Sequence, residues 1–197
     1  MAAKNLHGMN AYSEIGRAWQ ERPDQFEAAQ RQRLIKWRTE PVTLRIDHPT
    51  RLDRARALGY KAKPGFIVVR QRVDRGGRQR PQIRKVRKTS HSRQNLILSK
   101  NYQQVAEERA ARRFPNTEVL NSYFAGKDGT HYWYEIILID KESPSITSDR
   151  RMDWIASATR RAFRGMTSAA KRRRGLYRKG IGTEKLRPSL RAHNRTK

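Results

Sequence analysis

The distribution of positive charge is the feature that most constrains how this chain can fold. The chain has 45 Lys and Arg residues against 18 Asp and Glu residues, a formal net charge of +27 over 197 residues. Residues 70–100 contain eleven basic residues and one acidic residue, and residues 160–197 contain fourteen and one. Self-repulsion of this size destabilises a compact monomer. We therefore expect a small core, built mostly outside these segments, and a polyanionic partner for the segments themselves.

A nucleic acid fits this pattern better than an anionic membrane surface does. Membrane binding requires a basic amphipathic helix with a wide apolar face, or a lipid anchor. Residues 78–93 contain Ile83 and Val86 as their only aliphatic residues, and the chain has no cysteine to acylate. It also has no apolar run of about 18 residues, and residues 1–10 lack the apolar centre of a secretory signal. We therefore expect a nucleic-acid partner and no membrane.

Composition limits the chain to one small domain with a basic extension. Apolar residues make up 36% of the chain, which is low for a globular protein and high for a disordered one. We predict a globular domain over residues 1–164, which includes a basic loop over residues 74–98. Residues 165–197 lack apolar periodicity, so we expect a basic, non-globular extension without folded structure of its own. The absence of cysteine excludes disulfides and thiol catalysis, and is consistent with a reducing compartment.

The N-terminal part of the domain predicts helices. Tyr12, Ile15 and Trp19 form one apolar stripe at helical spacing, which ends before Pro23. Asp24 is a candidate N-cap for a second helix, and we expect the two helices to form an antiparallel pair. The basic residues 47–65 allow a short helical turn over residues 50–58. This stretch is either a solvated linker or a segment that follows a phosphate backbone.

Three strands are predicted, two of them in a hairpin. Residues 66–73 alternate in the manner of a strand that is buried at its start and wet on one face at its end. Residues 117–125 and 130–139 are rich in aromatic and β-branched residues and flank a Gly- and Asp-containing turn over residues 126–129. This arrangement is typical of a β-hairpin.

Two further helices complete the predicted domain. A helix over residues 101–114 has Asn101 as its cap and a favourable pair between Glu108 and Arg112. Asp149 is a candidate start for a last helix that would turn Trp154, Ile155, Ala158 and Phe163 inward. The whole pattern predicts an α+β fold in which a small antiparallel sheet is flanked by helices.

No residue pattern indicates catalysis or a metal site. The five histidines lie in unrelated segments without the HxxxH or HExxH spacing of zinc sites. Asp74 and Asp140 each follow a predicted strand, so they could meet in space, as the ends of many strands do. A metal-dependent nuclease needs at least two converging carboxylates, which the sequence permits but does not indicate. An enzyme is therefore the minority interpretation of the residues alone, and we predict no metal and no cofactor.

The aromatic residues allow two interpretations, base stacking and core packing. Tyr132, Trp133 and Tyr134 alternate along a predicted strand, and strands of RNA-binding sheets use such residues to stack on bases. Core packing is the commoner role, and we assign Trp133 to the core. Tyr60 and Tyr177 lie among Lys and Arg outside the apolar segments, and they are the better candidates for stacking.

Three long segments of the sequence indicate a particular protein family. HPTRLDRARALGYKAKPGFIVVRQRV (residues 48–73), AEERAARRFPNTEVLNSY (106–123) and FRGMTSAAKRRRGL (163–176) resemble the eukaryotic- and archaeal-type large-subunit ribosomal protein fifteen family. The closing GTEKLRPSLR (182–191) is similar to its archaeal branch. The resemblance implies a structural, non-catalytic protein bound to large-subunit ribosomal RNA and to neighbouring ribosomal proteins, in the cytoplasmic ribosome.

The basic segments then supply the expected RNA contacts. Arginine bridges phosphates, and glycine lets the backbone approach RNA closely. The candidate RNA-binding residues are Arg51, Arg54, Arg56, Tyr60, Lys61, Lys63, Arg75, Arg78, Arg80, Arg84, Lys85, Arg87, Lys88, Arg93, Arg164, Lys171, Arg172, Arg173, Arg174, Tyr177, Arg178, Lys179, Lys185, Arg187 and Arg191. The alternatives are an RNA-processing enzyme and a free-standing RNA chaperone that acts on structured RNA. No small-molecule substrate is expected.

Overall fold

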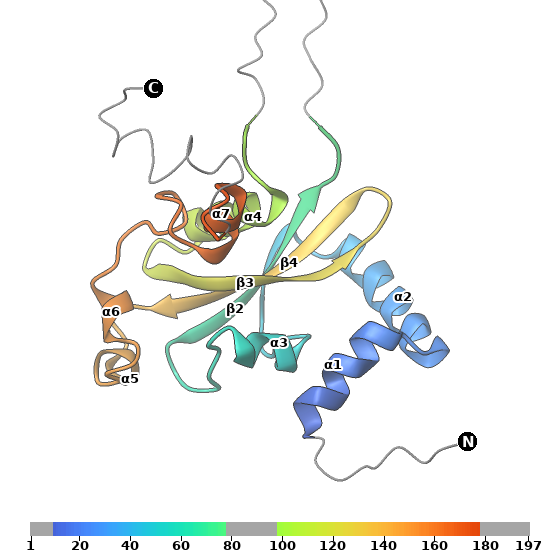
Figure 1. The fold of residues 1–197 in the computed structure, drawn as a ribbon, viewed down its shortest axis with the longest axis horizontal. Helices are drawn as coiled ribbons and strands as arrows, with labels where there is room; N and C mark the ends of the chain where they lie inside the picture. The colour runs from blue at the N-terminus through green and yellow to red at the C-terminus, as the bar shows by residue number, and fades with distance from the viewer. Residues whose placement is uncertain (1–9, 78–97, 178–197) are drawn as a thin grey trace, which may run out of the picture.

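A four-stranded antiparallel sheet forms the centre of the structure (Figure 1). The computed structural model describes residues 10–77 and 98–177. The strands lie in the order β1-β2-β4-β3. Their bounds are Thr43–Ile46 for β1, Phe66–Asp74 for β2, Thr117–Lys127 for β3 and His131–Asp140 for β4. The prediction of an α+β fold with a small antiparallel sheet is confirmed, while most of the basic loop and of the extension lies outside the described residues.

The predicted hairpin joins β3 to β4, and its turn is fixed by Asp128. The Asp128 carboxylate accepts hydrogen bonds from the backbone N–H groups of Thr130 at 2.8 Å and His131 at 2.5 Å, and from Arg38 at 2.9 Å. Partial burial raises the pKa of Asp128, but the bonds from Arg38, His131 and Thr130 outweigh it and hold the pKa well below its usual value. The turn residue therefore also ties the hairpin to the second helix of the chain.

Strand β4 is buried on both faces, and this divides the core into layers. Ile136 and Leu138 pack in the cluster that includes Ala106 of the fourth helix, whereas Ile137 and Ile139 pack in the opposite cluster. Because successive side chains of a strand point to opposite faces, an uninterrupted apolar run is what a central strand with two covered faces requires. The register supports this position, since β4 pairs with β2 on one side and β3 on the other.

Seven helices surround this sheet in the part of the chain that the structure describes. They are α1 (Ala11–Glu21), α2 (Asp24–Thr39), α3 (Leu52–Ala57), α4 (Tyr102–Arg113), α5 (Pro144–Thr147), α6 (Asp153–Ala156) and α7 (Ser168–Arg173). The predicted positions of α1, α2, α3 and α4 are confirmed. The Asn101 side chain accepts a hydrogen bond from the Gln104 N–H at 2.7 Å, so the predicted cap of α4 is also present.

Several local predictions near the helices were wrong. Helix α2 begins at Asp24 itself, with Pro23 at the N-cap position and no side-chain cap. Helix α1 packs against α3 instead of forming an antiparallel pair with α2. In Figure 1 the axes of α1 and α2 lie at an angle to each other and do not run side by side. Glu108 forms its ion pair with Lys100 at 2.7 Å instead of with Arg112. The positions of α1 and Glu108 depend on partners, α3 and Lys100, that the spacing of residues in the sequence does not reveal.

Two further corrections concern the elements themselves. A helix that starts at Asp149 was expected, but α6 begins only at Asp153 and has four residues, after the equally short α5 that precedes Asp149. Trp154 of α6 is 49% exposed instead of turned inward. Strand β1 was not predicted. It has only four residues and includes the exposed Arg45, so its apolar pattern is weak; its pairing with β2 specifies it.

Residues 165–177 also pack against the sheet and α4. The expectation that this stretch contributes nothing to the core was wrong, since Thr167, Ala169 and Ala170 are buried. The Thr167 side chain accepts a hydrogen bond from the Ala170 N–H at 3.4 Å and caps α7. The Asn101 side chain donates to the Ala169 carbonyl at 3.0 Å. Small alanines let α7 approach α4 closely, and such contacts leave no strong periodicity in a six-residue helix.

We predict that Trp133→Ala lowers the free energy of unfolding by roughly 3–5 kcal/mol. Trp133 is 1% exposed and packs on Trp37, with ring centroids 5.9 Å apart. Urea denaturation would measure the loss. Trp154→Ala is the matched control, because this exposed side chain should contribute less than about 0.5 kcal/mol. Equal stability of the Trp133 variant and the parent would contradict the assignment of Trp133 to the core.

Candidate nucleic-acid interface

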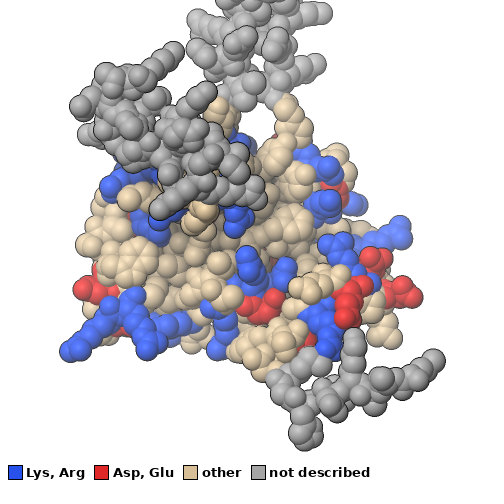
Figure 2. Space-filling view, viewed as in Figure 1, with Lys and Arg blue, Asp and Glu red and all other residues tan. Residues whose placement is uncertain are grey.

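Several acidic side chains of this protein are buried, whereas nearly all the Lys and Arg side chains of the described residues reach the surface. Four glutamates, Glu107, Glu108, Glu118 and Glu135, are buried, whereas Arg70 is the only buried Lys or Arg among the described residues. Figure 2 shows Lys and Arg in several patches on one face, with Asp and Glu in fewer and smaller patches. The surface available to a partner is therefore even more basic than the composition suggests.

Buried Glu135 anchors the segment that leads into α3. Its carboxylate accepts hydrogen bonds from the Thr50 N–H at 2.9 Å, the Thr50 hydroxyl at 2.5 Å and the Tyr123 hydroxyl. Arg70 lies 3.7 Å from the same carboxylate and 2.6 Å from Glu40. Burial, with the neighbouring Glu135 charge, raises the pKa of Tyr123 far above its usual value, so this phenol stays a neutral donor.

Buried Glu107 anchors α7 in the same way. The hydroxyls of Ser122 in β3 and Thr167 before α7 each donate to its carboxylate at 2.5 Å. Burial raises the pKa of Glu107 in spite of these two bonds and the nearby Arg161 charge. A buried carboxylate requires donors of this kind, since burial without them is costly. The bond from Thr167 therefore fixes where the basic last turn of α7 lies.

These anchors bring α3 and α7 together at edge strand β3. A hollow of about 160 Å³ lies between them, which we call the α3–α7 hollow. Its lining residues are Arg51, Arg54, Leu58, Gln103, Asn121, Ser122, Tyr123, Phe124, Ser168, Ala169 and Arg172. Arg54 and Arg172 are exposed and come from two basic segments far apart in the sequence. Amide and hydroxyl groups beside two arginines suit a phosphate group.

Three other candidates near α3 are engaged within the protein. Lys61 and Lys63 both bond Asp149, at 2.7 and 2.9 Å, and these two bonds, with one from the Arg151 N–H, hold the pKa of Asp149 well below its usual range. Tyr60 packs edge-on against Phe66, with ring centroids 6.0 Å apart, and belongs to the margin of the core. The expectation that Tyr60 lies outside the core was therefore wrong.

Further candidates on the first half of the chain lie against aromatic rings. The guanidinium of Arg51 is 4.6 Å from the ring centroid of Trp19, and Arg51 also bonds Asp53 at 2.9 Å. Arg56 lies 5.4 Å from the ring of Tyr12, and Arg75 lies 5.0 Å from that of Tyr132. Arg75 also donates to the Asp128 carbonyl. These contacts orient the cations without neutralising Arg56 or Arg75.

The candidates around α7 lie at one end of the molecule. Lys171 and Arg172 are exposed, Arg173 donates to the Ser99 carbonyl, and Arg174 donates to the Gly165 carbonyl at 2.9 Å. Arg164 is exposed and donates to the Thr159 carbonyl at 3.3 Å. Tyr177 is 60% exposed. The bond from Arg173 to residue 99 places α7 beside the returning end of the basic loop.

The remaining candidates lie outside the described residues. They are Arg78, Arg80, Arg84, Lys85, Arg87, Lys88 and Arg93 in the basic loop, and Arg178, Lys179, Lys185, Arg187 and Arg191 in the extension.

Sequence reasoning missed a group of arginines on α4. Arg109, Arg112 and Arg113 line a hollow of about 390 Å³ together with Val42, Thr43 and Gln71. Their spacing of three and four residues places the side chains on one face of the helix. Helical spacing is the signal in the sequence that marks this group, whereas the net charge of whole segments does not reveal it.

The two carboxylates that could have formed a catalytic metal site lie at opposite ends of β4. Asp74 pairs with His131 at the start of β4, whereas Asp140 pairs with Thr117 at its other end, so these two carboxylates do not converge. Within residues 10–77 and 98–177, no three His, Asp or Glu side chains gather where they could hold a metal ion. No helix in the same ranges is sufficiently long and apolar to cross a membrane.

Comparison with known families places this chain among ribosomal proteins. The family described as Ribosomal L15 matches residues 10–193. The chain belongs to this family. The resemblance inferred from the sequence is therefore confirmed, as is the prediction of a structural ribosomal protein instead of an enzyme.

Individual relatives carry a more specific name. The protein called Large ribosomal subunit protein eL15 in Methanocella arvoryzae is 52% identical over 191 residues, which cover 94% of this chain and 97% of the relative. The protein of the same name in Picrophilus torridus is 46% identical, with coverage of 95% and 98%. That of Methanocorpusculum labreanum is 50% identical, with coverage of 82% and 84%. These sources are archaea, in agreement with the predicted branch.

We predict that a chain ending at Arg164 unfolds at a lower urea concentration than one ending at Tyr177. The shorter chain lacks Thr167, so one oxygen of the buried Glu107 carboxylate loses its donor. The point variant Thr167→Val removes the same bond at nearly constant shape and should cost about 1–3 kcal/mol. Ser168→Ala is the control and should change stability by less than about 0.5 kcal/mol. Identical urea midpoints for the two truncated chains would show that α7 adds nothing to the fold.

Proposed function

We propose that this chain is a structural constituent of the large ribosomal subunit, located in the cytoplasmic ribosome, where it binds and stabilises large-subunit ribosomal RNA. Membership of the Ribosomal L15 family and the name shared by its relatives support this proposal. Neighbouring large-subunit proteins are the further partners that the proposal expects.

The observation that carries the RNA-binding role is the α3–α7 hollow. Arg54 and Arg172 belong to segments that the sequence marked separately as basic, and the fold brings both to one polar hollow. The carboxylates of Glu107 and Glu135, which accept hydrogen bonds from the lining residues Ser122 and Tyr123, are buried and add no charge to this surface. A polyanion that contacts both segments at once would offset the self-repulsion of the surface.

The basic loop and the extension that begins at residue 165 join the same interface in this proposal. Gly76, where the described chain enters the loop, exchanges hydrogen bonds with the Tyr102 hydroxyl at 3.0 and 2.8 Å. Ser99, where the chain returns, accepts from Arg173 of α7. Both basic segments therefore start from the end of the molecule formed by α4 and α7 (Figure 1).

We predict that binding to large-subunit ribosomal RNA weakens steeply with salt. If about 6–10 phosphates are neutralised, affinity should fall by ~10³–10⁵ between about 50 and 200 mM salt. Filter binding of the full chain to purified RNA measures this slope. Retention on large subunits through a high-salt wash then distinguishes a structural constituent from an RNA-processing enzyme or a chaperone. A flat salt response, or release in the wash, would remove the proposal.

We also predict that arginine geometry matters in the α3–α7 hollow. The double variant Arg54→Lys, Arg172→Lys keeps both charges but removes two planar forks that can bind phosphate with two parallel bonds. It should come off large subunits at lower salt than the parent. Arg33→Lys on α2 is the control, because Arg33 is exposed but does not line the hollow. Equal retention of all three proteins would leave charge alone as the cause of binding.

A further inference from the structure

The two N-terminal helices are packed less completely than the rest of the fold. Helix α1 has no buried residue, and Trp37 is the only one in α2. Ile35 is 49% exposed, and Phe26 and Leu34 are only partly covered. Helices retained in a fold with their apolar side chains half covered present a surface that a partner can complete.

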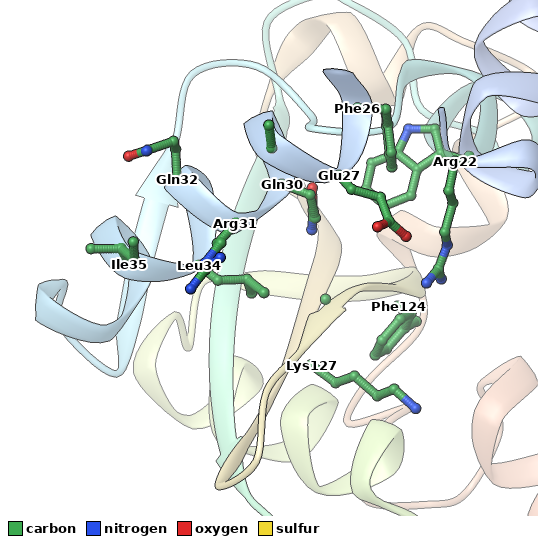
Figure 3. Close-up of a pocket in the computed structure, with 13 residues that line it drawn as sticks. Arg22, Phe26, Glu27, Gln30, Arg31, Gln32, Leu34, Ile35, Phe124 and Lys127 are labelled. Atoms are coloured by element: carbon green, nitrogen blue, oxygen red, sulfur yellow. The ribbon is translucent and has the colours of Figure 1, made fainter. Parts of the chain in front are cut away.

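A preformed pocket lies beside these side chains. It has a volume of about 680 Å³ and is bounded by α2 and the end of β3 (Figure 3); we call it the α2 pocket. Gly126 of β3 fixes the distance between its walls, because a Cβ there would lie 3.0 Å from the Trp37 ring and 3.2 Å from Leu34. Gln30 also donates to the Ala125 carbonyl at 3.4 Å. Helix α2, which forms one wall of the pocket, is therefore fixed on β3 by packing and by a hydrogen bond within the protein.

The lining of the α2 pocket combines aromatic surface with cations. Trp19, Phe26 and Phe124 supply the rings, and Phe26 meets Trp19 edge-on with ring centroids 4.9 Å apart. In Figure 3, Arg22 and Lys127 extend on either side of Phe124. Arg31 is a third cation of the lining, against one carboxylate, that of Glu27. None of these three cations was among the residues expected to bind RNA.

The backbone at Arg22 also points to a role for its side chain. Arg22 ends α1 with φ of 47°, in the left-handed region. Glycine or asparagine usually occupies this position after a helix, because other residues are strained there. Strained backbone is often found at functional sites, where a particular side chain is needed.

We propose that the α2 pocket receives one unstacked nucleotide of the large-subunit ribosomal RNA. Its base lies against Phe26 and Phe124, and its phosphates lie near Arg22 and Lys127. Aromatic rings are the usual platforms for unstacked bases, and a lining with three cations and one carboxylate favours a polyanion over an apolar or basic protein segment. The proposal rests on the ribosomal function proposed above and adds a particular contact to it.

Binding of full-length variants to purified large-subunit RNA tests the pocket. The double variant Arg22→Gln, Lys127→Gln should reduce the slope of log affinity against log salt by about two, one for each lost phosphate contact. Phe26→Leu keeps every charge, so it should weaken binding by roughly 5- to 100-fold at an unchanged slope, as expected for a lost stacking contact. Arg33→Gln on the same helix is the control, and its slope should equal that of the parent.

A second measurement does not depend on the stability of any variant. Ultraviolet cross-linking of intact large subunits should attach a nucleotide to Phe26, Phe124 or Trp19 of the parent chain. If the parent binds RNA and all variants have the same affinity and salt slope, the proposed role of the pocket is wrong and the ribosomal function is unaffected. Chemical cross-links from Lys127 to another ribosomal protein, in place of a nucleotide, would also overturn it. A parent that does not bind RNA would instead overturn the function itself.

Discussion

Hydrogen bonds to buried carboxylates are the interactions on which the rest of this structure depends. Glu135 holds Thr50 before α3, and Glu107 holds Thr167 before α7. A buried carboxylate that loses its donors is strongly destabilising, whereas one with good donors is tolerated. The two helices therefore cannot move away from edge strand β3 without leaving charge unpaired in the interior. This constraint sets the position of Arg54 and Arg172.

The same arrangement explains how so basic a chain can have a folded domain. Four glutamates are buried, where each meets a hydroxyl, amide or cation, so these four do not neutralise the surface. Among the described residues the core is built mainly by a few apolar strands, above all β4. Surface repulsion then remains as an energy that a polyanion can relieve. Half-covered residues such as Phe26 and Ile35 add a second surface that the isolated chain leaves incomplete.

Prediction from the sequence succeeded where a signal was local and strong. The hairpin around Asp128, the cap at Asn101 and the burial of Trp133 all follow from periodicity or turn chemistry within a short stretch. It failed where the deciding partner lies elsewhere in the chain. Strand β1 is specified by its pairing with β2, and Tyr60 is drawn to the core by Phe66. Helix α7 is held by Glu107, a residue whose burial no pattern in the sequence indicates.

The sequence by itself determined the class of fold, the central place of the apolar strands, the need for a polyanionic partner and the family, because composition and periodicity are properties of the chain alone. Only the tertiary structure decided which cations share a surface, which are engaged by Asp149, and where hollows open beside Arg172 and Phe124. The reason is physical. The charge pattern of the sequence determines how strongly the chain can attract a polyanion. The positions of the charges in space depend on buried hydrogen bonds between residues that are distant in sequence.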